Sequence, residues 1–219
     1  MLKYILWDHD GVLVDTEHWY FVSTQQALAE LGIYFDKDEY VAHTTSGRTM
    51  WELARQRGVS EDIIAVHRRN RDRYYQAHLR TEDIEIPGVL DVLAELSQFF
   101  SMAIVTTAKK ADFALIHQDR TIVSYMDFVV ANGDYARSKP APDPYLTALE
   151  RFGAQPHEAI AIEDSERGLR SAVAAGLECI MIEHAFTQSQ DFSRASRVVR
   201  SIRDLPAILI GRQARPISG

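Results

Sequence analysis

Two aspartates one residue apart, Asp8 and Asp10, directly follow a short apolar run near the start of the chain. The run, residues 4–7, is too short for a helix and is typical of a strand buried on both faces. Carboxylates at the end of such a strand lie at the edge where open α/β sheets bind ligands. Because two carboxylates this close repel each other, they predict a bound cation, and Mg²⁺ prefers oxygen ligands. The alternative, a surface turn with solvated acids, is disfavoured by the apolar residues on both sides.

Polar residues also follow three later apolar runs, at 102–105, 127–131 and 159–162. After these runs come, in order, Thr106-Thr107, a segment that ends in Ser138-Lys139-Pro140, and Glu163-Asp164-Ser165. If the runs are parallel strands, all of these residues meet at one edge of the sheet. The sequence therefore predicts a cluster of carboxylates, a hydroxyl and a lysine.

These residue types suit phosphoryl transfer, which needs a nucleophile, neutralisation of the phosphoryl oxygens and an acid for the leaving group. A carboxylate can attack phosphorus and form an aspartyl-phosphate. A second acid can protonate the leaving oxygen and later activate water. Mg²⁺ holds the phosphate against the nucleophile, and a hydroxyl and an ammonium bind the remaining oxygens.

The elements that must position these residues fall into two blocks. Helices are predicted at 16–32, 36–43, 48–57 and 60–79, with no strand-like run between them. From residue 84 onward, helices at 88–99, 109–118, 143–152 and 165–175 alternate with strands, which predicts right-handed βαβ units and a parallel sheet. The expected fold class is α/β, with a Rossmann-like core at 1–14 and 84–219 and an inserted helical cap at 15–83.

Four segments, in this order, resemble the motifs of the haloacid dehalogenase superfamily of phosphohydrolases, in its β-phosphoglucomutase and phosphoglycolate phosphatase branch. They are DHDGVLVDTE at 8–17, IVT at 104–106, SKPAPD at 138–143 and IEDS at 162–165. The resemblance covers roughly residues 1–200. His9 occupies a position that is more often Phe or Leu in the family.

The resemblance implies a role for each motif residue. Asp8 would be the nucleophile and Asp10 the general acid and base, while Thr106 and Lys139 would bind the phosphoryl group. Mg²⁺ would be held by Asp8, Asp164 and the backbone carbonyl of Asp10, with Glu163 beside them in the metal shell. Gly11 and Thr107 are expected to line the substrate site.

The cap offers weaker candidates. Residues 45–48 resemble the substrate-specificity loop of the family, so Arg48 is expected to meet a distal anion of the substrate, unless it is solvated or salt-bridged. His18 either faces the cleft or lies on an ordinary helix face. Lys109 either reaches the pocket or points into solvent.

The predicted function is a Mg²⁺-dependent phosphatase that hydrolyses a small phosphorylated metabolite through an aspartyl-phosphate. One alternative is a sugar-phosphate mutase of β-phosphoglucomutase type. That mutase has a His and a cap-helix Lys where this chain has Tyr20 and Asn70. Dehalogenase activity is disfavoured, because the dehalogenases of this superfamily lack the second acid that Asp10 supplies here. A non-catalytic binding protein is the remaining alternative, and the intact motif acids and lysine argue against it.

Composition sets broader limits. The 219 residues, 46% of them hydrophobic, can form one domain or one domain with an inserted module. A net charge of −7 disfavours a broad nucleic-acid surface, and the basic cluster at 68–73 is interpreted as a solvated helix face. The sequence shows no signal-peptide pattern and no apolar stretch of about 18 residues. A cytoplasmic monomer without a membrane partner is expected.

Overall fold

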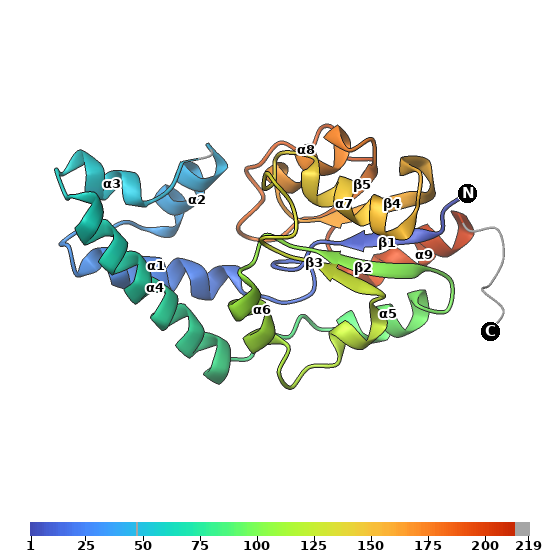
Figure 1. Ribbon diagram of the computed structural model, residues 1–219, viewed down its shortest axis with the longest axis horizontal. Coiled ribbons are helices and arrows are strands. Elements are labelled where there is room, and N and C mark those ends of the chain that lie inside the picture. The colour runs from blue at the N-terminus through green and yellow to red at the C-terminus, as the bar shows by residue number, and fades with distance from the viewer. Residues whose placement is uncertain (47, 213–219) are drawn as a thin grey trace. The chain divides into compact units, whose positions relative to one another are not determined.

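The computed structural model describes residues 1–46 and 48–212, which form two compact units. The core unit comprises Met1–Asp15 and the chain from Glu85 onward, and the helical unit comprises Thr16–Ile84 (Figure 1). Gly47, in the expected specificity loop, lies outside the described residues.

A six-stranded parallel sheet forms the centre of the core unit, in the order β3-β2-β1-β4-β5-β6. The strands are β1 (Tyr4–Trp7), β2 (Ser101–Val105), β3 (Phe128–Val130), β4 (Ala159–Glu163), β5 (Glu178–Ile182) and β6 (Arg197–Val199). The predicted α/β class with a parallel sheet is confirmed. Because β1 lies between β2 and β4, successive strands are added on both sides of it, and the carboxyl end of β1 marks a switch point where such sheets bind ligands.

Helices cover both faces of this sheet. They are α5 (Val89–Leu96), α6 (Lys110–Ile116), α7 (Asp143–Phe152), α8 (Glu166–Ala174) and α9 (Leu205–Leu209). Helices α7 and α8 lie on one side, and α5 lies on the other (Figure 1). Leu6 and Ala161 pack with Tyr145 and Leu169 in the core beneath α7 and α8. Because strand side chains alternate between faces, covering both faces makes the central strands apolar at nearly every position.

The helical unit contains α1 (Glu17–Ala29), α2 (Lys37–Thr45), α3 (Trp51–Gln56) and α4 (Glu61–Thr81). Each helix predicted between residues 16 and 79 is therefore present, with its ends shifted by a few residues. Helices α1 and α4 pack along each other, and Leu28 and Ile64 are fully buried in this unit. Asp36 begins α2 with a reciprocal capping box in which its side chain accepts from Glu39 N.

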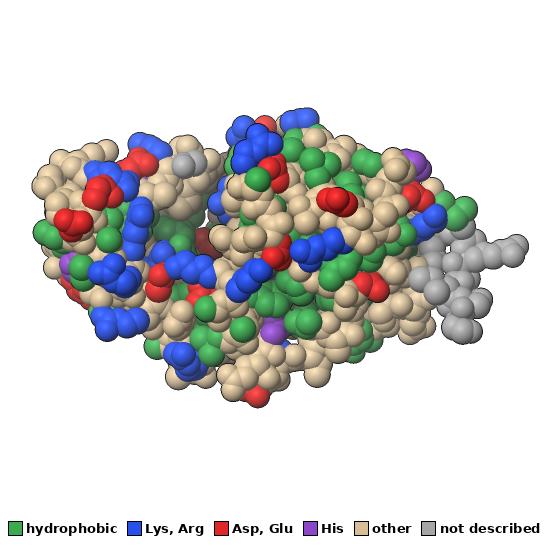
Figure 2. Space-filling model, in the orientation of Figure 1, with side chains coloured by type: hydrophobic (Ala, Val, Ile, Leu, Met, Phe, Trp, Pro, Cys, Tyr) green, Lys and Arg blue, Asp and Glu red, His purple; other side chains and the backbone are tan. Residues whose placement is uncertain are grey.

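One face of the molecule carries side chains of both charges. On the face shown in Figure 2, acidic and basic side chains are interspersed over both units. Among the helices of the described residues, none is long and apolar enough to cross a membrane. Cys179 is a buried free thiol.

Candidate active site

The motif residues of the core unit lie at the carboxyl ends of neighbouring strands. Asp8 follows β1, Thr106 follows β2, and Glu163 is the last residue of β4. Backbone hydrogen bonds continue the sheet past these ends, because Asp8 N donates to Ile162 O at 2.8 Å and Thr106 N donates to Val130 O at 2.9 Å. The strand register therefore brings the acids of the first and fourth motifs side by side.

Lys139 is the centre of the cluster. Its Nζ donates to Asp8 Oδ1 and to Glu163 Oε1, both at 2.6 Å, and to the backbone carbonyl of Val105 at 2.9 Å. These bonds use all the N–H groups of the ammonium. Lys139 is 5% exposed and Glu163 is fully buried, so the ion pairs lie almost out of water.

The electrostatics of the cluster show an excess of negative charge. Burial alone would lower the pKa of Lys139, but Asp8 and Glu163 outweigh it and hold that pKa above its usual value. Burial and the nearby Glu163 carboxylate raise the pKa of Asp8 well above its usual range, against the opposing effect of Lys139. Burial also raises the pKa of Asp164. Three carboxylates against one ammonium leave a formal excess of two negative charges.

This excess fits a divalent cation. Asp8, Glu163 and Asp164 each place one carboxylate oxygen so that the three oxygens lie within 4.8 Å of one another. An all-oxygen donor set suits a hard ion such as Mg²⁺ or Ca²⁺. Glu163 is also engaged elsewhere, since Oε1 accepts from both Lys139 and the Tyr145 hydroxyl, the latter at 2.8 Å. These contacts anchor Lys139, and a place for Glu163 beside a bound ion stays a prediction.

Asp164 is oriented by a histidine. His184 Nε2 donates to Asp164 Oδ2 at 2.8 Å, and the backbone N–H of Phe186 donates to His184 Nδ1 at 3.3 Å. Since Nδ1 accepts, the ring proton is on Nε2. Gly11 makes this approach possible, because a Cβ at its φ of +77° would lie 2.1 Å from Asp164 Oδ2 and 2.9 Å from His184 Nε2.

Asp10 projects from a tight turn within the first motif. The carbonyl of His9 accepts from the backbone N–H of Leu13 at 2.8 Å, and Gly11 N donates to Val14 O at 2.8 Å. The Asp10 side chain is 32% exposed. Its Oδ2 lies 3.2 Å from His9 Nδ1 and 3.5 Å from Thr106 Oγ1. Asp10 is thus more accessible than Asp8.

The other predicted substrate residues lie in different surroundings. Thr107 Oγ1 accepts from Arg167 Nη2 at 3.4 Å in the core unit. Arg48 is exposed in the helical unit, where its Nε donates to Ser46 Oγ at 2.9 Å. His18 contacts the ring of Trp19, and Lys109 directly precedes α6. Their roles toward a substrate stay predictions.

Sequence reasoning missed two residues of the site, Tyr145 and His184. Tyr145 lies two residues after the third motif on α7, where a buried aromatic predicts packing and gives no sign of its hydroxyl's partner. His184 could have been found, because it follows the apolar run at 179–182 in the same way that the motif acids follow theirs. The rule about strand ends that identified the motif acids therefore applies to His184 as well.

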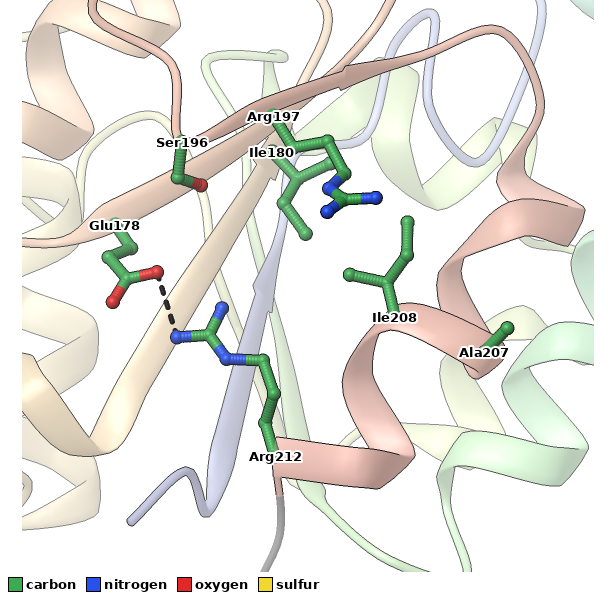
Figure 3. Close-up of a pocket in the computed structure, with 7 residues that line it drawn as sticks. All are labelled: Glu178, Ile180, Ser196, Arg197, Ala207, Ile208 and Arg212. Carbon is green, nitrogen blue, oxygen red and sulfur yellow. Dashed lines mark hydrogen bonds and ion pairs between the residues drawn. The ribbon is translucent and has the colours of Figure 1, made fainter.

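A cavity of about 550 Å³ lies at the opposite edge of the sheet, where β5 and β6 begin (Figure 3). An ion pair between Arg212 Nη2 and Glu178 Oε2, at 2.8 Å, lies beside it. The other lining residues are Ile180, Ser196, Arg197, Ala207 and Ile208. This cavity contains no residue of the acidic cluster.

Comparison with known proteins agrees with this geometry. The family model of haloacid dehalogenase-like hydrolases matches residues 5–182. Protein CbbY of Cereibacter sphaeroides is 31% identical over 94% of each chain. The crystal structure of a CbbY variant from Rhodobacter sphaeroides in complex with xylulose-(1,5)bisphosphate has a TM-score of 0.80 and 28% identity, covering 94% of this chain and 96% of that one.

Two other relatives have names that state an activity. Fructose-1-phosphate phosphatase YqaB of Escherichia coli is 26% identical, over 80% of this chain and 94% of its own length. β-Phosphoglucomutase of Bacillus subtilis is 27% identical, over 95% of this chain and 94% of its own length. The two names represent both of the rival functions.

Replacing Gly168 by Ala should disturb the cluster of Asp8, Lys139 and Glu163 by displacing the Glu163 carboxylate. A Cβ there would lie 1.9 Å from Glu163 Oε2, so the carboxylate would have to leave Lys139. Helix propensity alone favours Ala by about 1 kcal/mol. We nevertheless expect Gly168→Ala to lower the free energy of unfolding by about 1–3 kcal/mol, as overpacking does, and to reduce activity.

Gly211→Ala is the matched control for urea unfolding, because a Cβ at Gly211 meets no atom within 4 Å. Its effect should stay within about 0.5 kcal/mol. Equal stability of the two variants would contradict the close packing of Gly168 against Glu163.

Proposed function

The chain belongs to the haloacid dehalogenase-like hydrolase family, and on that premise we propose that it is a Mg²⁺-dependent phosphatase of small phosphorylated metabolites. The proposed reaction passes through an aspartyl-phosphate on Asp8. The observation that carries the proposal is the buried Lys139 ammonium, which bonds both Asp8 and Glu163 at 2.6 Å within an acidic cluster. One relative is named as a fructose-1-phosphate phosphatase, and another was crystallised with a sugar bisphosphate. These two relatives favour a sugar phosphate as the substrate class.

Asp8 is the proposed nucleophile. Lys139 holds Oδ1 of its carboxylate, so the group is oriented and Oδ2 is the oxygen that would attack phosphorus. As the bond between Oδ2 and phosphorus forms, the bond from phosphorus to the leaving oxygen breaks. The Lys139 ammonium and the Thr106 hydroxyl would stabilise negative charge on the phosphoryl oxygens.

Asp10 is the proposed proton carrier. It would first protonate the leaving oxygen and then, as a carboxylate, take a proton from the water that attacks the aspartyl-phosphate. Release of inorganic phosphate returns Asp8 to its carboxylate form and Asp10 to its acid form. The partial exposure of Asp10 suits this task, because its carboxyl must reach both the leaving group and water.

A bound Mg²⁺ would offset the two excess negative charges and polarise the phosphoryl group. Asp8, Asp164 and the backbone carbonyl of Asp10 would hold it. His184 would keep Asp164 in the orientation that a ligand needs, as hydrogen-bonded neighbours of metal ligands generally do.

The mutase stays the main alternative, since both reactions would share the aspartyl-phosphate and differ in what attacks it. A mutase must exclude water and hold a sugar hydroxyl in line. By the resemblance, Tyr20 and Asn70 replace the cap residues that serve this purpose. Asn70 is engaged within the helical unit, where its Nδ2 donates to Glu30 Oε2 at 2.9 Å. Water is therefore the proposed acceptor.

Chelation tests the metal requirement. EDTA should abolish hydrolysis of p-nitrophenyl phosphate, because an acidic cluster with an uncompensated charge repels an anionic substrate, and Mg²⁺ should restore it. Ca²⁺ should restore activity poorly. Mg²⁺ prefers six oxygen ligands in octahedral geometry at bond lengths of about 2.1 Å, whereas Ca²⁺ favours more ligands and longer bonds. Circular dichroism of the chelated protein checks that the fold survives. Full activity in EDTA would be incompatible with the proposed mechanism.

Substituting the two acids separates their roles. Asp8→Asn should trap no phosphoenzyme, because the nucleophile is gone. Asp10→Asn should lower turnover by about 10²–10⁴-fold, the usual contribution of a general acid or base. With p-nitrophenyl phosphate, whose leaving group needs little acid help, Asp10→Asn should still form the phosphoenzyme and fail to hydrolyse it. Mass spectrometry of quenched protein measures this, and activity retained by a folded Asp8→Asn would exclude Asp8 as nucleophile.

A substrate of the mutase distinguishes the two functions. Given β-glucose 1-phosphate, the enzyme should release inorganic phosphate, slowly if at all, rather than accumulate glucose 6-phosphate, and a sugar bisphosphate primer should not change this. A coupled dehydrogenase assay for glucose 6-phosphate, run beside a phosphate assay, gives the ratio. Efficient conversion with little phosphate released would overturn the assignment in favour of a mutase.

A further inference from the structure

His9, between Asp8 and Asp10, is completely buried although it is polar. Its side chain lies against α6, with ring centroids 4.9 Å from Phe113 and 5.0 Å from His117. A buried imidazole is costly unless its nitrogens are hydrogen-bonded. Both nitrogens of His9 have partners, and those partners connect Asp10 to the end of α6.

The three side chains form a continuous hydrogen-bonded chain. His9 Nδ1 lies 3.2 Å from Asp10 Oδ2, and His9 Nε2 lies 2.8 Å from His117 Nε2. In the carboxylate form that takes a proton from water, Asp10 can only accept, so His9 Nδ1 donates to it. In the neutral ring, Nε2 of His9 then carries the lone pair, and the N–H between the two rings must come from His117 Nε2.

The remaining nitrogen of His117 supports this direction. Its Nδ1 is buried and has no hydrogen-bond partner among the described residues. As a lone pair it tolerates that position better than an N–H would, because an unpaired buried donor costs about 1–3 kcal/mol. Burial, with His9 and Arg120 nearby, lowers the pKa of His117 to about 3, so this ring is neutral. The opposite direction would place an N–H at the unpaired atom.

We propose that His117 is a positioning residue for Asp10: it donates to His9 Nε2, fixes the His9 tautomer that donates from Nδ1, and thereby holds the Asp10 carboxylate for proton transfer. This inference rests on the proposed function, because it needs Asp10 as the acid and base. Thr106 Oγ1 approaches the same Asp10 oxygen only to 3.5 Å, so the His9 bond is the closer of the two. Misplacing a catalytic group by about 1 Å can cost about 10²-fold in rate.

Two substitutions of His117 test the proposal. His117→Leu removes the donor, whereas His117→Gln keeps an N–H near the position of Nε2. His117→Leu should lower kcat on phenyl phosphate, whose leaving group needs a proton, by about tenfold to 10²-fold with KM nearly unchanged. The burst of p-nitrophenolate from p-nitrophenyl phosphate should hardly change. In both assays the rate of His117→Gln should stay within about threefold of the wild-type rate. A change of that size is small beside the usual contribution of a general acid.

Nitrogen NMR of ¹⁵N-histidine-labelled protein gives a readout that does not depend on activity. The wild-type protein should show His9 protonated at Nδ1 and His117 at Nε2. His9 protonated at Nε2, or equal kinetics of the Leu and Gln variants, would overturn the positioning role while leaving the phosphatase proposal intact. A wild-type protein with the expected tautomers but no activity on either ester would instead overturn the proposed function, and the positioning role with it.

Discussion

The buried ion pairs of Lys139 impose the strictest constraint on the core unit. Removing one partner from such a pair typically costs about 3–5 kcal/mol, because a charge is then left buried and uncompensated. Lys139 escapes this cost only while Asp8, Glu163 and the carbonyl of Val105 stay within hydrogen-bond distance. These partners come from the ends of three different strands, so the sheet must keep its register for the cluster to exist. The same order of strands that satisfies the ammonium also delivers the acids to one edge.

The side chains of the Lys139 cluster have hydrogen-bond partners, but its negative charge is not balanced. Tyr145 and the Ser165 hydroxyl both approach Glu163, yet neither carries a positive charge. In the proposed function, this site would bind an anionic phosphate ester together with a cation. Under the proposed function, Lys139 would supply orientation and a bound ion most of the neutralisation, so substrate affinity would depend on metal occupancy.

The sequence predicted the central strands and the strand-end acids because both follow local rules. Apolar runs of four or five residues define β1, β2 and β4, and a parallel sheet brings their ends together whatever the loops do. Strand β6 was not predicted, because Arg197–Val199 has three residues, two of them exposed. The partners Tyr145 and His117 were also missed. Their roles depend on contacts with residues 18 and 108 positions away, and no periodicity reports such contacts.

The bond between His9 and His117 also limits how this chain can diverge. An apolar residue at position 9 would leave the His117 donor without its acceptor, and an apolar residue at position 117 would leave a lone pair of His9 unpaired in a buried site. Either single replacement therefore passes through a less stable or less active intermediate, whereas the paired replacement restores a consistent interior. Positions 9 and 117 should accordingly have exchanged together in descent, and a library that varies one of them alone would underestimate how many sequences this fold can accept.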